Sequence, residues 1–431
     1  MITMDIKKVL NNVRIKNGIW LYALQFFQLV VPLLTFPYLT RVLGAEKYGV
    51  FSIALNVVNY LQVLEEYGFN YSGTRKMALS SKQNYSKVYS NIFSSKIFLS
   101  CITGVVLIVI LLLSIYPPEL KKCMLILFGI VIGATLQQTW VFQGFQVMKY
   151  ITIINVVSRT ISVILIFMFV KSKDDIFLYC VLFTSTNLLS GIASVYLCKK
   201  KFALEFHFSK FKDIIKELRD GFSLFLTSAM SIMVSTLGVF LLGIYAAAYD
   251  VGIYTAMQKI PNVLITCFTP ISQVLFPYIS TLFQNNRIKA KKILKIMYGP
   301  VMFVIGGMCI VLGFMSEFIV EILCGKEYIS GVAYVPVLLA WVFLSIFNNF
   351  LGTQTLVASG RSKQYSQIFV VSAITSVICN VCFIKILYCK GAAWATFISE
   401  VVLTILLTTY IVKNRMAIFS QLRNTDNPQM I

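Results

Sequence analysis

The sequence predicts an all-α polytopic membrane protein of about twelve transmembrane helices, built as two related halves. Three observations support this fold class. Apolar residues make up 58% of the 431 residues and charged residues only 13%, and the mean hydropathy is +0.79. The apolar residues fall in continuous runs long enough to cross a bilayer, whereas a β-barrel would show short alternating segments. Patterns in the first half also recur in the second.

The expected spans follow one another with short connections, and none of these is long enough for a separate catalytic domain. They lie near residues 18–40, 48–68, 92–115, 122–142, 151–170, 175–198, 221–245, 251–280, 294–315, 332–354, 364–386 and 391–412. The first run is too long for a cleavable signal peptide and lacks a small-residue cleavage site, so it is interpreted as the first helix.

The first span carries a polar row although its composition is that of a membrane helix. Gln25, Gln28 and Thr35 recur at helical spacing, and Pro32 and Pro37 interrupt the same run. A polar face inside hydrocarbon needs a partner helix or a water-filled cavity. Prolines also free backbone carbonyls and allow bending, which suggests that this helix moves.

The net charge of +21 follows membrane topology and does not indicate a nucleic-acid partner. With both termini in the cytoplasm, about 26 Lys and Arg lie inside and about nine outside, which favours this orientation and an even number of spans. Glu65 and Lys96 are expected near span ends, where long side chains reach the interface.

The residues offer little for catalysis. His207 is the single histidine and lies in a basic loop, and the ten cysteines lie mostly in apolar runs, where thiols pack as small hydrophobic groups. Cys379 and Cys382 form a CxxC, but on a predicted helix this favours packing over metal binding. Since nucleotide-binding and nucleophile motifs are also missing, we expect no cofactor, no metal and no enzyme activity.

Internal repetition predicts the domain organisation. An offset of 203 aligns Gly49 with Gly252 and Asn59 with Asn262, and an offset of 216 aligns Gln138 with Gln354. We therefore expect an N-terminal six-helix bundle at 1–200, a basic cytoplasmic linker at 201–220 and a C-terminal bundle at 221–431. Because each repeat has an even number of spans, the bundles should be related by a pseudo-two-fold axis along the membrane normal.

Polar rows in spans one, two and eight, with a further row in span seven, predict a central cleft. Cations within spans are costly unless paired or hydrated, so Arg159 and Lys259 join this set as candidate ligands. The expected cleft residues are Gln25, Gln28, Asn56, Asn59, Arg159, Lys259, Asn262, Thr266 and Gln273.

Three acidic residues are candidates for ion coupling. Glu66 and Glu400 lie in or beside spans and Asp220 opens span seven. A carboxylate in a partly desolvated cleft can exchange a proton or bind a cation, and its two charge states can favour different access states. The alternative is that Glu400 pairs with a cation for structural reasons.

Several blocks resemble a known family. PLLTFPYLTRVLG at 32–44, EEYGFN at 65–70 and WVFQGFQVMKY at 140–150 resemble the O-antigen repeat-unit flippases, the Wzx group of the polysaccharide transporter family. That family belongs to the multidrug/oligosaccharidyl-lipid/polysaccharide exporter superfamily. The resemblance implies a fold like that of the multidrug and toxin extrusion (MATE) transporters, with a cleft between two six-helix bundles.

The resemblance also implies a function and a location. The protein would move undecaprenyl-pyrophosphate-linked oligosaccharide from the cytoplasmic to the periplasmic leaflet of the bacterial inner membrane by alternating access, driven by a proton or sodium gradient. Partners would include membrane lipids, the polysaccharide polymerase and the chain-length machinery. Two alternatives remain open: a MATE-type drug/cation antiporter, which an acidic aromatic cleft would favour, and a non-transporting scaffold of a glycan-assembly complex, which would lack a cleft.

Overall fold

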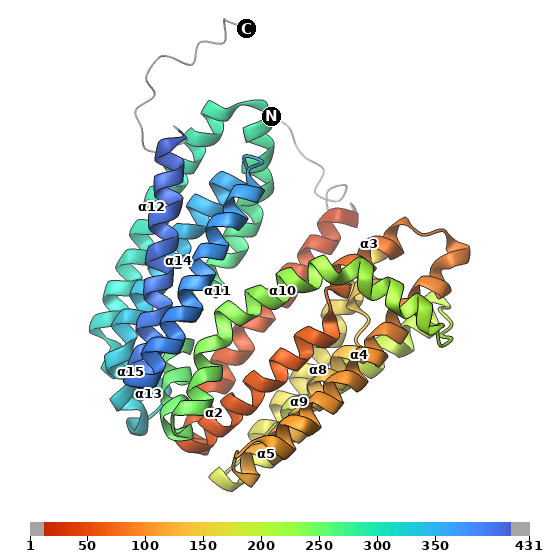
Figure 1. Ribbon diagram of the computed structural model, residues 1–431, viewed down its shortest axis with the longest axis horizontal. Helices are drawn as coiled ribbons and strands as arrows, with labels where there is room; N and C mark the ends of the chain where they lie inside the picture. The colour runs from red at the N-terminus through yellow and green to blue at the C-terminus, as the bar shows by residue number, and fades with distance from the viewer. Residues whose placement is uncertain (1–12, 415–431) are drawn as a thin grey trace, which may run out of the picture. The chain divides into compact units, whose positions relative to one another are not determined.

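The computed structural model describes residues 13–414, and the described part is almost entirely helical (Figure 1). The first half contains α2 (Val13–Glu66), α3 (Phe69–Leu79), η1 (Lys82–Asn84), α4 (Tyr85–Leu113), α5 (Pro118–Leu127), α6 (Gly129–Leu136), α7 (Thr139–Gly144), α8 (Met148–Phe169), η2 (Lys173–Asp175) and α9 (Ile176–Phe202). The second contains α10 (Phe211–Tyr245), α11 (Ala248–Asn285), α12 (Arg287–Phe314), α13 (Ser316–Leu323), η3 (Lys326–Tyr334), α14 (Val335–Leu351), the π-helix η4 (Gly352–Val357) and α15 (Ser362–Lys413).

Nine helical segments of the described residues are long and apolar enough to cross a membrane, or ten with the bent helix α10 counted as one span. The chain is therefore an all-helical polytopic membrane protein, as the sequence predicts. Helix α2 is 54 residues long, about 81 Å at 1.5 Å per residue, whereas a hydrocarbon core is about 30 Å thick.

Two of the longest helices are broken where the sequence predicts a connection between spans. Within α2, Gly44 has φ 71° and ψ 172°, a conformation that favours glycine because it has no Cβ. Within α15, Tyr388 has φ 47°. These breaks separate the predicted spans 18–40 from 48–68 and 364–386 from 391–412.

The chain divides into two compact units. Unit 1 takes the residues up to Thr255 together with Leu323–Glu327, and unit 2 takes Ala256–Ile322 and the chain from Tyr328 onward. In unit 1, α8 packs on α2 and α9, and in unit 2, α14 packs on α12 and α15 (Figure 1). Unit 1 thus includes α10 and the first turns of α11, a division that differs from the predicted boundary at 201–220.

The core of unit 1 is rich in aromatic side chains. Trp140, Phe142 and Phe69 are at most 1% exposed, and they join one cluster with Tyr89 and Ile92. Large rigid rings bury much apolar area at low entropic cost. This cluster fixes α3, α4 and α7 against one another at one end of the unit.

A close helix crossing in unit 1 joins residues that are 203 positions apart. A Cβ on Gly49 would lie 1.7 Å from the Ala248 carbonyl oxygen, and one on Gly252 would lie 1.9 Å from that of Ala45. One turn further on, the Thr255 hydroxyl donates to Ser52 Oγ over 3.2 Å. The contacts are reciprocal: Gly49 meets Ala248 as Gly252 meets Ala45, and the equivalents Gly49 and Gly252 also meet each other. This is the pattern of contacts on a two-fold axis. Only glycine permits so close an approach.

Candidate functional site

A buried ion pair joins three helices of unit 1. Glu65 of α2 is 0% exposed and Lys96 of α4 is 3% exposed, with 3.5 Å between Nζ and Oε1. Lys96 Nζ also donates to the Ala134 carbonyl of α6 over 2.7 Å. The expectation that these side chains reach the interface is wrong, because neither is accessible. One signal in the sequence points to this pair, namely an acid and a base that each lie within a long apolar run.

The Ala134 carbonyl lies at a break within the fourth span. After α6 ends at Leu136, the Gln138 backbone N–H donates to Ser194 Oγ over 2.8 Å. The Gln138 side-chain amide donates to the Thr135 and Leu136 carbonyls, each over 3.2 Å. Backbone polar groups freed inside a membrane must be satisfied within the protein. Here the side chains of Lys96 on α4, of Ser194 on α9 and of Gln138 itself, which lies between α6 and α7, satisfy them.

Unit 2 contains a corresponding irregularity at the position that the offset of 216 predicts. Gln354 lies in the π-helix η4, and its amide donates to both the carbonyl and the hydroxyl of Ser272, each over 2.9 Å. Gln138 and Gln354 are both 0% exposed. Interrupted helices at corresponding positions of two repeats are typical of the substrate and ion sites of secondary transporters.

The predicted cleft residues of unit 1 differ in their surroundings. Asn56 is buried and donates to the Thr236 carbonyl of α10 over 3.4 Å, so it contributes to helix packing. Gln25 and Asn59 are partly exposed and Gln28 is exposed. Arg159 on α8 is partly buried, and no carboxylate within the described ranges lies within ion-pair distance of it.

The predicted cleft residues of unit 2 lie on α11. Lys259 and Thr266 are exposed and Asn262 is partly exposed. The Thr266 hydroxyl donates to the Asn262 carbonyl over 2.9 Å. Gln273 lines a small pocket of about 120 Å³ of mixed character, which the polar residues Thr269, Ser272, Ser345 and Asn349 and the apolar residues Ile265, Phe268 and Ile346 also line. This pocket provides amide and hydroxyl groups, the donors and acceptors that suit a sugar or an ion with its water.

The three coupling candidates lie in three separate environments. Glu400 of α15 accepts a hydrogen bond of 2.6 Å from the Asn348 amide, and the Asn348 Oδ1 accepts one of 2.9 Å from Thr404. The alternative expectation is that Glu400 pairs with a cation. Among the described residues its partner is instead the Asn348 amide. Glu66 accepts from the Gln62 amide over 3.0 Å.

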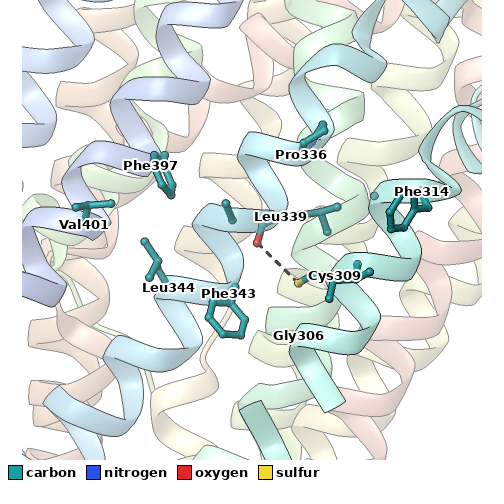
Figure 2. A pocket seen from close by; sticks show the side chains of 12 residues that line it. Gly306, Cys309, Phe314, Pro336, Leu339, Phe343, Leu344, Phe397 and Val401 are labelled. Carbon is teal, nitrogen blue, oxygen red and sulfur yellow. Dashed lines mark hydrogen bonds between the residues drawn. The ribbon is translucent and has the colours of Figure 1, made fainter. Parts of the chain in front are cut away.

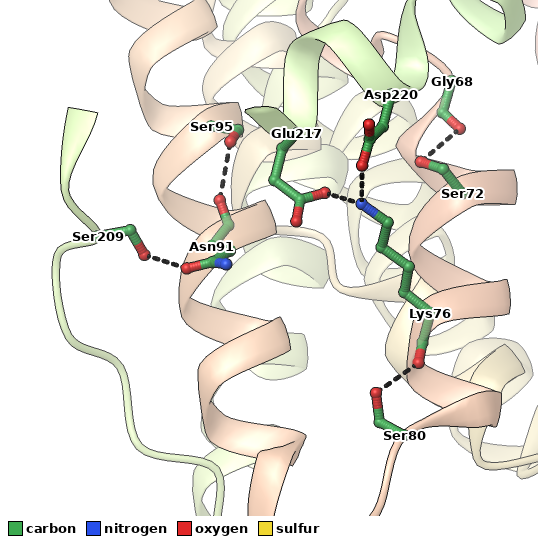
Figure 3. Close-up of polar contacts among 9 residues, drawn as sticks. All are labelled: Gly68, Ser72, Lys76, Ser80, Asn91, Ser95, Ser209, Glu217 and Asp220. Carbon is green, nitrogen blue, oxygen red and sulfur yellow. Dashed lines mark hydrogen bonds and ion pairs between the residues drawn. The ribbon is translucent and has the colours of Figure 1, made fainter. Parts of the chain in front are cut away.

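Asp220 belongs to a triad of charges at one end of unit 1. Lys76 of α3 lies 3.0 Å from its carboxylate and 2.6 Å from that of Glu217 (Figure 3). The Asp220 side chain is 46% exposed, so the pair is accessible to water and contributes little to stability. This contact ties the start of α10 to α3.

Comparison with known proteins places this arrangement in a family. A "Putative O-antigen transporter" of Escherichia coli (strain K12) is 28% identical over 413 residues, which cover 94% of this chain and 98% of the relative. The fold is similar to that of the lipid II flippase MurJ in an inward closed conformation, with a TM-score of 0.71, 14% identity and coverage of 94% of this chain and 90% of that one. It is also similar to an inward-facing MATE multidrug resistance transporter, with a TM-score of 0.61, 12% identity and coverage of 90% and 98%.

The resemblance read from the sequence blocks is thereby confirmed at the level of family and fold. The family model described as "Polysaccharide biosynthesis protein" matches residues 15–283, well over half of the chain. The chain belongs to the polysaccharide biosynthesis protein family.

Proposed function

We propose that the protein moves an undecaprenyl-pyrophosphate-linked oligosaccharide from the cytoplasmic to the periplasmic leaflet of the bacterial inner membrane by alternating access. The observation that carries the proposal is the nearly full-length similarity to the "Putative O-antigen transporter" of Escherichia coli. The residues suit such a substrate. Arg159 and Lys259 can attract a pyrophosphate, and the amides and hydroxyls of α2 and α11 can bind sugars.

The architecture that we propose for this cycle has twelve spans in two bundles, 1–200 and 221–431, joined by the linker 201–220. The breaks at Gly44 and Tyr388 support this count, because each divides a helix far longer than a bilayer is thick. Ten candidate spans with two of them divided make twelve. The matched irregularities at Gln138 and Gln354 support two repeats.

A drug/cation antiporter and a scaffold are the two competing functions. An antiporter for cationic drugs would need an acidic site, whereas the span cations Arg159 and Lys259 favour an anionic substrate. The polysaccharide polymerase and the chain-length machinery are proposed partners of the same pathway.

The test is reconstitution. Purified protein in vesicles should move a fluorescent undecaprenyl-pyrophosphate oligosaccharide between leaflets, measured by its accessibility to a membrane-impermeant quencher. In cells, deletion of the gene should cause the same lipid-linked glycan to accumulate on the inner leaflet. Movement of a cationic dye but not of the glycan lipid would overturn the proposal in favour of the antiporter, and movement of neither would favour the scaffold.

The proposed ion coupling rests on Glu400, with Glu66 and Asp220 as further candidates. A Gln at position 400 keeps the hydrogen bond with Asn348 possible but removes the exchangeable charge. We expect Glu400→Gln to bind the glycan lipid normally while its transport rate no longer depends on a proton or sodium gradient. Gradient dependence equal to that of the wild type would exclude Glu400 as the coupling group.

A further inference from the structure

Unit 2 carries a groove of about 790 Å³ between α12, α14 and α15 (Figure 2). Phe314, Phe343 and Phe397 contribute aromatic walls, one from each helix, and Gly306, Gly313 and Ala340 leave the space between them. A Cβ on Gly306 would meet only Phe343, at 3.4 Å, and one on Gly313 only Leu339, at 3.8 Å. The hollow therefore exists because two of these positions have no side chain and the third, Ala340, has only a methyl group.

The lining of the groove is almost without polarity. Its side chains include no charged, amide or hydroxyl group, and the single heteroatom is Cys309 Sγ, which lies 3.8 Å from the Leu339 carbonyl oxygen (Figure 2). Such a lining excludes a sugar, a phosphate or an ion, because their polar groups would lose water without gaining a partner. The occupant must be hydrocarbon.

The groove opens onto the surface of helices that are candidate membrane spans. Its three helices all belong to candidate spans, and Phe314 is 89% and Ile310 61% exposed. Mobile acyl chains of the bilayer can cover a smooth helix surface without entering it. A hollow of this size must be filled by a hydrocarbon chain, because an empty hollow would lose dispersion contacts along its whole lining.

The spacing of the two glycines indicates which kind of hydrocarbon chain fills the groove. Gly306 and Gly313 are seven residues apart, so they lie on one face of α12 about 10.5 Å apart along its axis. Two recesses in line along a helix suit a long chain with regular side branches better than a smooth one. A polyisoprenyl chain has a methyl branch on every unit.

We propose that this groove binds the polyisoprenyl tail of the lipid-linked oligosaccharide while the headgroup crosses the membrane. The inference rests on the proposed function and adds a second subsite to it. The polar candidate residues would bind the headgroup, and the groove would hold the tail in the bilayer beside unit 2.

The chain offers a closely matched set of variants. Gly306→Leu and Gly313→Leu would fill the groove, whereas Gly307→Leu makes the same change on the neighbouring residue, where a Cβ meets nothing within 4 Å and which does not line the groove. In vesicles, both groove variants should show about tenfold weaker apparent affinity for a substrate with an undecaprenyl tail. Their affinity for an analogue with a three-isoprene tail should be unchanged, and Gly307→Leu should match the wild type for both.

A binding measurement separates this inference from the transport function. Phe343 is replaced by the photo-crosslinker p-benzoylphenylalanine, and the protein is placed in nanodiscs that contain both undecaprenyl-pyrophosphate and phospholipid. The crosslinker should label undecaprenyl-pyrophosphate in preference to phospholipid, even in a preparation that transports nothing. The same residue in place of Phe397 repeats the experiment from another helix if the first variant does not fold. Labelling of phospholipid alone, or an equal loss of affinity for long-tailed and short-tailed substrates, would overturn the proposal while leaving the transport function intact.

Discussion

At the scale of single residues, the buried charges carry the most information. Glu65 and Lys96 form an ion pair without access to water, and Lys96 also donates to a carbonyl at a helix break. Desolvating two charges is costly, so such a pair is rarely an efficient way to gain stability. It does make α2, α4 and α6 depend on one another, since moving any of these helices away exposes a charge to an apolar environment.

Replacing Lys96 by Met is expected to lower the free energy of unfolding by about 3–5 kcal/mol, because Glu65 is left buried and unpaired. Thermal unfolding of the purified protein in detergent measures this. The double variant Glu65→Gln/Lys96→Met should recover most of the loss. As a control, Lys47→Met breaks a pair with Glu119 whose side chains are 24% and 30% exposed, and this should cost about 1 kcal/mol or less. A Lys96→Met protein as stable as the wild type would contradict the pairing.

Arg159 differs from Lys96 because no acidic side chain of the described region pairs with it. We expect Arg159→Ala to abolish surface glycan while the protein level in the membrane stays unchanged. Arg159→Lys should retain transport only in part, because an ammonium group cannot form the bidentate contact with phosphate that a guanidinium forms. Lys171→Ala, just beyond the end of the same helix, is the control and should export normally. Full export by Arg159→Ala would remove Arg159 from the site.

At the scale of elements, the sequence predicted the helices well and their interruptions poorly. Apolar runs reveal where spans lie, and Gly44 falls between two predicted spans. The break at Gln138 was not predicted, because the apolar run 122–142 has the length of one continuous span despite the polar pair Gln137 and Gln138. The groups that stabilise the break, Ser194 and Lys96, come from distant parts of the chain. The pairing of Glu65 with Lys96 was missed for the same reason: it depends on helix packing and not on local sequence.

The crossing at Gly49 gives a prediction for one pair of elements. Gly49→Ala places a methyl group against the Ala248 carbonyl, with a Cβ to oxygen distance of 1.7 Å before any shift. We expect α2 and α11 to separate and the protein to be lost from the membrane or to unfold at a clearly lower temperature. Gly299→Ala has open space around its Cβ and should be about 0.5–1 kcal/mol more stable, because alanine favours a helix. Immunoblots of membranes and thermal unfolding measure both.

At the scale of the whole molecule, contacts within unit 1 agree with the predicted sidedness of the loops. Segments predicted outside meet each other, as Lys47 meets Glu119 and the Tyr249 hydroxyl meets the Glu327 carbonyl. Segments predicted inside meet each other as well, as Lys76 meets Glu217. Which of these two sets of segments faces the cytoplasm is predicted from the charge bias alone.

Reporter fusions therefore test the topology. Fusions at Asn84 and Asn285 should report cytoplasm and a fusion at Glu327 should report periplasm, read with a phosphatase that is active only outside and a fluorescent protein that folds only inside. The reverse result at all three positions would invert the orientation, and a mixed result would contradict the even number of spans.

The reciprocal crossing of Gly49 with Gly252 also bears on the origin of the chain. A contact in which each residue meets its own equivalent is self-complementary, so it does not require two different sequences. Before duplication and fusion, a protein of half this length with one such glycine would have matched a second copy of itself at this point. Duplication and fusion of such a protein would enclose a homodimer interface within one polypeptide and would leave the two halves free to diverge wherever they do not touch it.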